Sequence, residues 1–367
     1  MITMKILLCS PVVGISNSNP GGIAVWEKNI MDYHNGHPSD IEIDVQSCDR
    51  SRYINENTGK VKRLYCGIVD YSKIIRDIKI KLRKGNYDAI HLCTTASISL
   101  IKDYLIFKYA KRKRLRTILH FHFGRIPELA EAQTWEWRWL KKVLALTDTA
   151  IVIDRMSYDT LMRCGYNNVV SVPNPLAPEL VQEIESNRGT ERENHLVLFV
   201  SRVFKKKGIY ELVKACKEIP NIKLKVVGHV EDTDKEALES IAGHGSWLTF
   251  IGGIPHKDVI KELLACDIYV LPTYTEGFPN AIIESMACGT PTVTTPVGAI
   301  PEMLDMEGEP CGICVPPKDV EQLREAIISL LDSPGQKKLF AERSQKRVNE
   351  LYSIESVWNQ LYKVWKS

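Results

Sequence analysis

The sequence predicts an α/β protein with two domains, each built on a parallel sheet that helices cover on both faces. Three observations support this fold class. Short apolar runs of strand length alternate with helical patterns along the chain, which is typical of parallel sheets with helical crossovers. A length of 367 residues suits two domains of ordinary size. Residues 171–178, SVPNPLAP, hold three prolines and fit a stiff hinge between the domains.

The first half of the chain contains four predicted strands, each a short run of apolar residues. They cover residues 5–9, 88–93, 117–122 and 149–153. A glycine-rich loop follows the first strand and leads into a helix at residues 24–33. A basic helical segment precedes the second strand, so strands and helices alternate as this fold class requires.

The second half contains six predicted strands and ends in an amphipathic helix. The strands cover residues 196–201, 223–227, 248–251, 267–271, 291–295 and 312–315. The last helix has one broad apolar face, so it must pack against a large surface. That face consists of Leu351, Ile354, Val357, Trp358, Leu361, Val364 and Trp365.

Composition and charge exclude several classes of protein. No run of about 18 uncharged apolar residues is present, so a membrane-spanning helix is not expected. Ten cysteines without a disulfide or zinc framework suit a reducing cytosol, so we expect a cytoplasmic protein. The net charge of +3 conceals an asymmetry, because residues 1–180 hold 26 Lys and Arg against 18 Asp and Glu. This first half, with a net charge of +8, is expected to face an anionic partner.

The strongest functional motif is TEGFPNAIIESMACG at residues 275–289. Pro279 lies near the start of a predicted helix that ends at Gly289. The N-terminus of this helix offers unpaired N–H groups and a positive dipole end, which suit a phosphate. Glu276 and Glu284 are ~12 Å apart along a helix axis at 1.5 Å per residue. One carboxylate could therefore reach a sugar and the other a ribose, with a diphosphate between them.

Two further motifs follow the first strand of each half. SRVFKKKG at residues 201–208 places Arg202 and Lys207 across a strand-to-helix turn, where two cations can stabilise a departing diphosphate without a metal. NPGGIA at residues 19–24 contains adjacent glycines that let a ligand approach the backbone closely. Neither GxGxxG nor GxxxxGK[ST] is present, which argues against an NAD-dependent oxidoreductase and a P-loop protein.

These motifs, in this order over nearly the whole chain, resemble those of the retaining GT-B glycosyltransferases of family 4, the glycosyl transferases group 1. The resemblance implies two Rossmann-like domains whose parallel sheets face a central cleft. Residues 1–176 plus 352–367 would form the acceptor-binding domain, with the last helix returning to it. Residues 177–351 would form the domain that binds the nucleotide-sugar donor.

The resemblance also implies a role for each motif residue. Glu276 would contact the donor sugar and stabilise charge rather than attack covalently, and Glu284 would contact the ribose. Arg202 and Lys207 would hold the diphosphate, and Ile254 would lie against the base. The catalytic set is Glu276, His122, Arg202 and Lys207. The donor-binding set is Gly21, Gly22, Ile254, Phe278, Pro279, Asn280, Ala281 and Glu284.

The histidine of this set comes from HFHFGR at residues 120–125. His120 and His122 flank Phe121, so both point to the same face if the strand persists. The resemblance implies that one of them contacts the donor sugar, and its spacing favours His122. Phe123, inserted before Gly124, departs from the family pattern and leaves His120 as the alternative.

No cofactor is expected, because the nucleotide-diphosphate sugar is a substrate. No metal is expected either, because Arg202 and Lys207 can hold the diphosphate. Asp232 and Asp234 match a DxD metal motif, but they begin a predicted helix and are interpreted as capping residues. The expected partners are a UDP- or GDP-sugar donor and a glycan or lipid-linked acceptor, used in surface polysaccharide or glycolipid synthesis. The alternatives are a GT-B-fold epimerase that acts on a nucleotide sugar, and a non-catalytic sugar-nucleotide-binding subunit.

The basic first half suggests a peripheral contact with the inner face of an anionic membrane. The segment at residues 73–84 is basic and amphipathic, residues 111–116 form a basic block, and three tryptophans lie beside Lys141 and Lys142. No nucleic-acid-binding motif is present, so no nucleic-acid partner is expected. The alternative is solvated helix faces with tryptophans in the core. The apolar face of the helix and the tryptophans are Ile74, Ile75, Ile78, Leu82, Trp135, Trp137 and Trp139.

Overall fold

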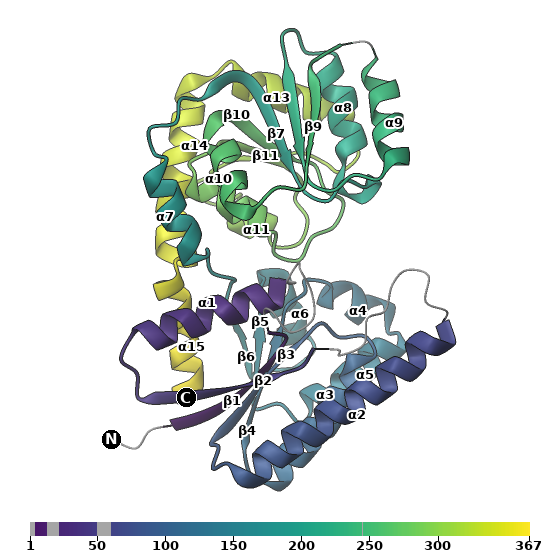
Figure 1. Ribbon diagram of the computed structural model, residues 1–367, viewed down its shortest axis with the longest axis vertical. Helices are drawn as coiled ribbons and strands as arrows, with labels where there is room; N and C mark the ends of the chain where they lie inside the picture. Colours follow the sequence, from purple (N-terminus) through teal and green to yellow (C-terminus); the bar gives the residue numbers. More distant parts are fainter. Residues whose placement is uncertain (1–3, 13–21, 50–59, 244) are drawn as a thin grey trace. The chain divides into compact units, whose positions relative to one another are not determined.

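The computed structural model describes residues 4–12, 22–49, 60–243 and 245–367, and it divides into two compact units (Figure 1). The first unit consists of Met1–Pro173 with Trp358–Ser367, and the second is Asn174–Val357. The boundaries expected from the sequence, after residue 176 and before residue 352, lie within a few residues of this division. The last helix is therefore shared, with most of its length in the first unit.

The described residues of the first unit form a six-stranded parallel sheet in the order β2-β1-β3-β4-β5-β6. Its strands are β1 (Met4–Ser10), β2 (Ile41–Ser47), β3 (Ala89–Thr94), β4 (Arg116–Phe121), β5 (Thr149–Val152) and β6 (Val169–Ser171). Its helices are α1 (Gly22–Gly36), α2 (Lys60–Lys84), α3 (Ser99–Arg112), α4 (Ile126–Ala132), α5 (Trp135–Leu144) and α6 (Arg155–Arg163).

Alternation along the central strands assigns each side chain to one face of this sheet. Leu92 and Phe121 belong to the core cluster that also contains buried residues of α2, α3 and α5. The residues that alternate with them along the two strands, such as His91 and His120, point to the opposite face, where Trp26 of α1 lies. Because both faces are buried, these strands read as continuous apolar runs in the sequence.

The second unit holds a six-stranded parallel sheet in the order β12-β11-β10-β7-β8-β9 within the described residues. Its strands are β7 (Glu193–Val200), β8 (Lys223–Val227), β9 (Leu248–Gly252), β10 (Cys266–Leu271), β11 (Thr292–Thr294) and β12 (Ile313–Cys314). Its helices are α7 (Pro178–Ser186), α8 (Ile209–Lys217), α9 (Asp232–Ala242), α10 (His256–Ala265), α11 (Asn280–Ala287), α12 (Ile300–Met303), α13 (Val320–Leu331) and α14 (Pro334–Arg347).

The last helix, α15 (Ile354–Lys366), buries its apolar face as expected from Val357 to Trp365. Leu351 is an exception and is 37% exposed, because a separate π-helical turn over Val348–Tyr352 precedes the extended residue Ser353. The C-terminal end of α15 is tied to the first sheet by Arg116, which donates hydrogen bonds to two of its free carbonyl groups.

The apolar face predicted for membrane contact lies instead in the core of the first unit. Ile74, Ile78 and Leu82 are at most 5% exposed and pack among the residues beneath α2. Trp137 is also a core residue at 2% exposure, whereas Trp135 is 50% exposed. The prediction of this face was wrong, because an amphipathic pattern shows that one side is apolar but not what covers it. In the described part of the chain, no helix is both long enough and apolar enough to cross a membrane.

Candidate functional site

The second sheet reverses its strand order between β7 and β10, which are neighbours in the sheet although two strands, β8 and β9, lie between them in sequence. In open parallel sheets, ligands bind outside the carboxyl ends of the strands at such a switch point. The loop after β7 carries Lys207, and the loop after β10 carries Glu276. The sheet topology therefore brings two of the predicted site residues to the position where a ligand is expected.

Lys207 and Glu276 form an ion pair at this switch point, with 2.5 Å between Nζ and Oε1. The side chains are only 20% and 12% exposed. Gly208, with φ of +73°, permits this approach, because a Cβ atom there would lie 1.9 Å from the carbonyl oxygen of Pro272. The backbone N–H of Tyr274 donates to the carbonyl of Lys206 and joins the same two loops. The pair is thus held by the backbone on both sides.

The loop after β11 packs against the backbone around Glu276 and holds it in place. Gly298 has φ of +57°, and a Cβ atom there would lie 2.3 Å from the carbonyl oxygen of Glu276. The N–H of Ala299 donates to the carbonyl of Gly277 at 2.9 Å. Phe278 is buried and packs edge-on against Tyr352 with 5.8 Å between ring centroids. Glu276 therefore sits on a rigid loop rather than a mobile one.

The N-terminus of α11 follows directly after this loop. Pro279 is its N-cap and supplies no side-chain cap, and Asn280 begins the helix. The N–H of Ile282 already bonds to the carbonyl of Pro279. The N–H groups of Asn280 and Ala281 are thus the ones placed to bind an anion, with the helix dipole behind them.

Glu284 lies farther along α11 and is 4% exposed. Its Oε1 is 2.9 Å from Nε2 of His256, the first residue of α10. This hydrogen bond raises the pKa of His256 and outweighs the lowering effect of burial. Ile254, which is half-buried, precedes His256 in the loop after β9. Sequence reasoning missed His256, although its place two residues after Ile254 in a strand-to-helix loop was the available signal.

Arg202 does not join the Lys207–Glu276 pair in this structure. Its guanidinium lies 3.7 Å from Glu231, with both side chains about 60% exposed, and such a surface pair is worth little. Asp232 and Asp234 lie in the first turn of α9, but Glu231 is the N-cap. The two aspartates therefore favour the helix through its dipole and not as capping residues, which corrects the sequence-based assignment.

The predicted site residues of the first unit are only partly described. Gly21 lies outside the described residues, and Gly22 is the exposed first residue of α1, with open space where a Cβ would be. His122 follows the last residue of β4 and is half-buried, and its ring lies 4.1 Å from that of His120. Burial lowers the pKa of His122 to about 3, so the imidazole is neutral.

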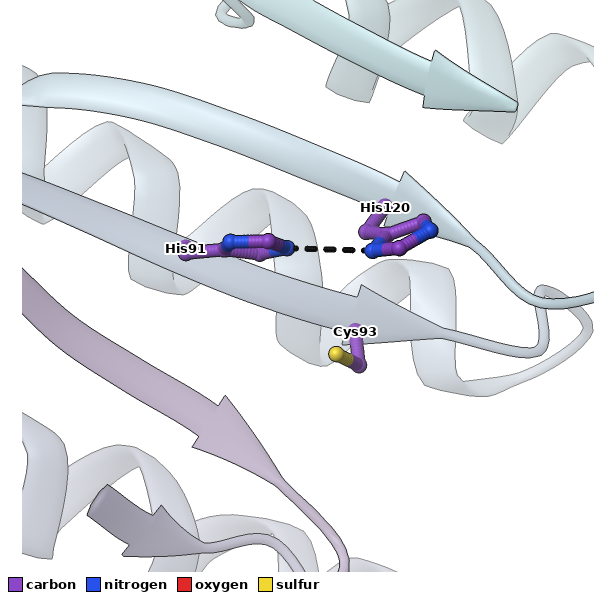
Figure 2. A group of neighbouring side chains, drawn as sticks. All are labelled: His91, Cys93 and His120. Carbon is purple, nitrogen blue, oxygen red and sulfur yellow. Dashed lines mark hydrogen bonds between the residues drawn. The ribbon is translucent and has the colours of Figure 1, made fainter. Parts of the chain in front are cut away.

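Buried hydrogen bonds link Trp365 to His91 and His91 to His120, and Figure 2 shows the second of them. Trp365 of α15 donates its indole N–H to Nδ1 of His91 at 3.0 Å. An indole N–H can only donate, so Nδ1 of His91 is an acceptor and Nε2 carries the proton. Nε2 of His91 lies 3.2 Å from Nδ1 of His120 and donates to it. Burial lowers the pKa of His91 to about 3, which keeps this tautomer neutral.

His91, Cys93 and His120 also have the residue types of a metal site, with ligand atoms within 4.8 Å of one another. The hydrogen bonds oppose that interpretation. A neutral His91 that bound a metal through Nε2 would carry its proton on Nδ1, where it would face the N–H of Trp365. Burial also raises the pKa of Cys93, and a metal requires the thiolate. These residues fit a hydrogen-bonded core better than a metal centre.

Comparison with known proteins gives a consistent assignment. Residues 181–347 match the family model described as glycosyl transferases group 1. TuaC of Bacillus subtilis, whose name assigns it to teichuronic acid biosynthesis as a glycosyltransferase, is 32% identical over 150 residues. That match covers 41% of this chain and 36% of TuaC, and the chain spans less than half the length of the first curated relatives it matches.

Solved structures resemble the whole chain. Sucrose-phosphate synthase of Thermosynechococcus elongatus has a TM-score of 0.73 at 22% identity and covers 99% of this chain and 98% of its own. HepE of Anabaena, solved in complex with UDP, has a TM-score of 0.69 at 16% identity over 98% of this chain and 99% of its own. Both likenesses concern the fold, which is GT-B. Through residues 181–347, the chain is similar to the glycosyl transferases group 1 family.

Proposed function

We propose that this chain is a retaining glycosyltransferase that moves a hexosyl group from a UDP- or GDP-sugar to a glycan or lipid-linked acceptor. The observation that carries the proposal is the Lys207–Glu276 pair at the switch point of the second sheet. The teichuronic acid role in the name of TuaC supports a role in surface polysaccharide synthesis, and the UDP bound to HepE supports a nucleoside diphosphate sugar as the donor.

The arrangement suits departure of a diphosphate without a metal or a further cofactor. Lys207 and the N–H groups of Asn280 and Ala281 would bind the diphosphate oxygens on which negative charge develops. Glu276 would stabilise the positive charge on the sugar ring as the bond from its anomeric carbon to phosphate breaks. The acceptor oxygen then bonds to the same face of that carbon and passes its proton to the departing phosphate. Arg202, being exposed, is free to turn toward the phosphates.

A thermal-shift screen tests the donor site. We expect one nucleoside diphosphate among UDP, GDP, ADP and CDP to stabilise the protein, by ~2.7 kcal/mol at 100 times its Kd, equally with and without EDTA. Arg202→Ala should weaken that binding about tenfold, as for the loss of one charge-assisted hydrogen bond. Arg188→Ala, at another exposed ion pair, is the matched control. If none of the diphosphates stabilises the protein, the proposal is contradicted. If EDTA abolishes the stabilisation, the expectation that binding needs no metal is contradicted.

We also infer that the first unit binds an anionic membrane surface through the outer side of α2. Tyr65, Ile68 and Ile80 are 62%, 58% and 39% exposed. These three residues lie on the same face of α2 as Arg76 and Arg83. A groove of about 330 Å³ on this face is lined in part by Arg76, Ile80 and Arg83. Exposed apolar and basic side chains on one helix face are typical of helices that lie at a membrane interface.

Vesicle sedimentation tests this contact. The double variant Arg76→Gln/Arg83→Gln should bind vesicles containing phosphatidylglycerol ~30-fold more weakly, since each basic residue near an anionic surface contributes about 1 kcal/mol. Lys338→Gln, an 80% exposed lysine of α14, should bind as the unmodified protein does. Equal binding of the unmodified protein to anionic and to neutral vesicles would contradict the inference.

A further inference from the structure

We propose that the first unit binds the terminal, uncharged sugar ring of its acceptor in a cavity beside β1 and β3, where Asp49 accepts hydrogen bonds from ring hydroxyls. The inference rests on the proposed function, because it names the class of acceptor. The first sheet reverses its strand order between β1 and β3, since β2 lies on the other side of β1. This is the position at which open parallel sheets bind ligands.

The cavity at this switch point has a volume of about 230 Å³. That volume equals about eight water molecules at ~30 Å³ each, which is room for one sugar ring. Its walls come from the carboxyl ends of β1, β2 and β3 and from the helices that follow them. The lining residues used below are Asp49, Tyr71, Thr94, Thr95, Ser99 and Lys102.

Asp49 is the acceptor group of this cavity and is fixed before any ligand arrives. Its Oδ2 accepts hydrogen bonds from the N–H of Val12 and the hydroxyl of Ser47, both at 2.8 Å. Oδ1 receives no hydrogen bond from the residues that the structure describes. An ionised carboxylate accepts and never donates, so the group it suits is a hydroxyl.

The charge of the cavity argues against an anionic ligand. Lys102 is 5% exposed, and its Nζ lies 2.5 Å from Oδ1 of the fully buried Asp103. Oδ2 of Asp103 accepts from the hydroxyl of Thr94 at 2.7 Å. Burial lowers the pKa of Lys102, but the carboxylate of Asp103 outweighs it and raises that pKa above its ordinary value. Because Asp103 already neutralises Lys102, the carboxylate of Asp49 gives the described lining of the cavity a net negative charge.

The backbone at the rim of the cavity is strained, and hydrogen bonds from neighbouring residues hold it in that conformation. Ala96 and Ser97 follow β3 and have φ of +62° and +63°, two successive residues in a conformation that non-glycine residues rarely adopt. The N–H of Ser97 donates to Glu136 at 2.6 Å, and Arg125 holds Glu136 with two hydrogen bonds of 3.0 and 2.6 Å. Such enforced strain gathers at ligand sites, and here it presents Thr95 and Ser99 at the cavity.

Saturation-transfer NMR on the full chain tests the proposal, with the methyl α-glycosides of glucose, galactose, mannose and N-acetylglucosamine as probes. We expect at least one of them to bind, and more tightly than its 6-phosphate. Asp49→Asn should weaken this binding at least tenfold, because an amide has one acceptor oxygen and carries no charge. Asp159→Asn, at an exposed carboxylate in the same unit, is the matched control and should bind as the unmodified protein does.

Nucleotide binding, followed by thermal shift in the same samples, separates this inference from the proposed function. A diphosphate response without any glycoside signal, or tighter binding of the 6-phosphates, would overturn the sugar cavity alone. Unchanged glycoside binding by Asp49→Asn would do the same. If Asp49→Asn fails to fold, Thr95→Val replaces it, since Thr95 is exposed at the rim, and it too must weaken the glycoside. A lack of response to every diphosphate would instead remove the proposed function.

Discussion

Glu276→Gln is expected to lower the turnover of sugar transfer by at least ~10²-fold and to leave nucleoside diphosphate binding within about twofold. The substitution keeps the shape of the side chain and removes its charge. Glu276 is 12% exposed and held by Lys207, and Gly298 fixes its backbone. A charge that is preorganised in this way stabilises the transition state far more than the ground state.

The measurement is transfer from a radiolabelled nucleotide sugar, with diphosphate affinity followed separately. Glu307→Gln, at an exposed glutamate of the same unit, serves as the control and should retain full turnover. Turnover of Glu276→Gln within tenfold of the unmodified protein would contradict the assignment. Epimerised nucleotide sugar formed in the absence of acceptor would favour an epimerase instead.

The strands could be predicted from the sequence wherever both sheet faces are buried. All ten predicted strands are present, with ends displaced by a few residues. The two that were missed, β2 and β6, are the edges of the first sheet. β2 is half-exposed along most of its length and β6 has three residues, so neither forms a continuous apolar run. The sequence signal for a strand is strong only where burial on both sides demands it.

The site residues could be named from motifs, but their pairing could not. Lys207 and Glu276 are 69 residues apart, and only the adjacency of β7 and β10 brings them together. Trp365 and His91 are separated by 274 residues. That contact needs the return of α15 to the first sheet, which the resemblance implied without naming a partner. Pairing depends on sheet order, and sheet order is not encoded locally.

Lys207→Met is expected to weaken diphosphate binding by ~10²-fold or more and to lower turnover as well. One part of the loss is a charge-assisted hydrogen bond, worth about 1.5–3 kcal/mol. The other part comes from Glu276, whose largely buried carboxylate would keep its charge without its cation and repel the incoming phosphates. Lys206→Met is the matched control, because Lys206 is the preceding residue of the same turn and is exposed.

The double variant Lys207→Met/Glu276→Gln decides between these two parts. If repulsion from an unpaired Glu276 causes much of the affinity loss in Lys207→Met, removing the charge of Glu276 should restore diphosphate binding. The double variant should then bind diphosphate at least tenfold more tightly than Lys207→Met. Turnover should not recover, because both groups that act on the transition state are then absent. Two residues that act as a unit show such coupling, whereas independent residues give additive losses. Additive losses in diphosphate affinity would mean that the ion pair is a structural contact and that the diphosphate is held elsewhere.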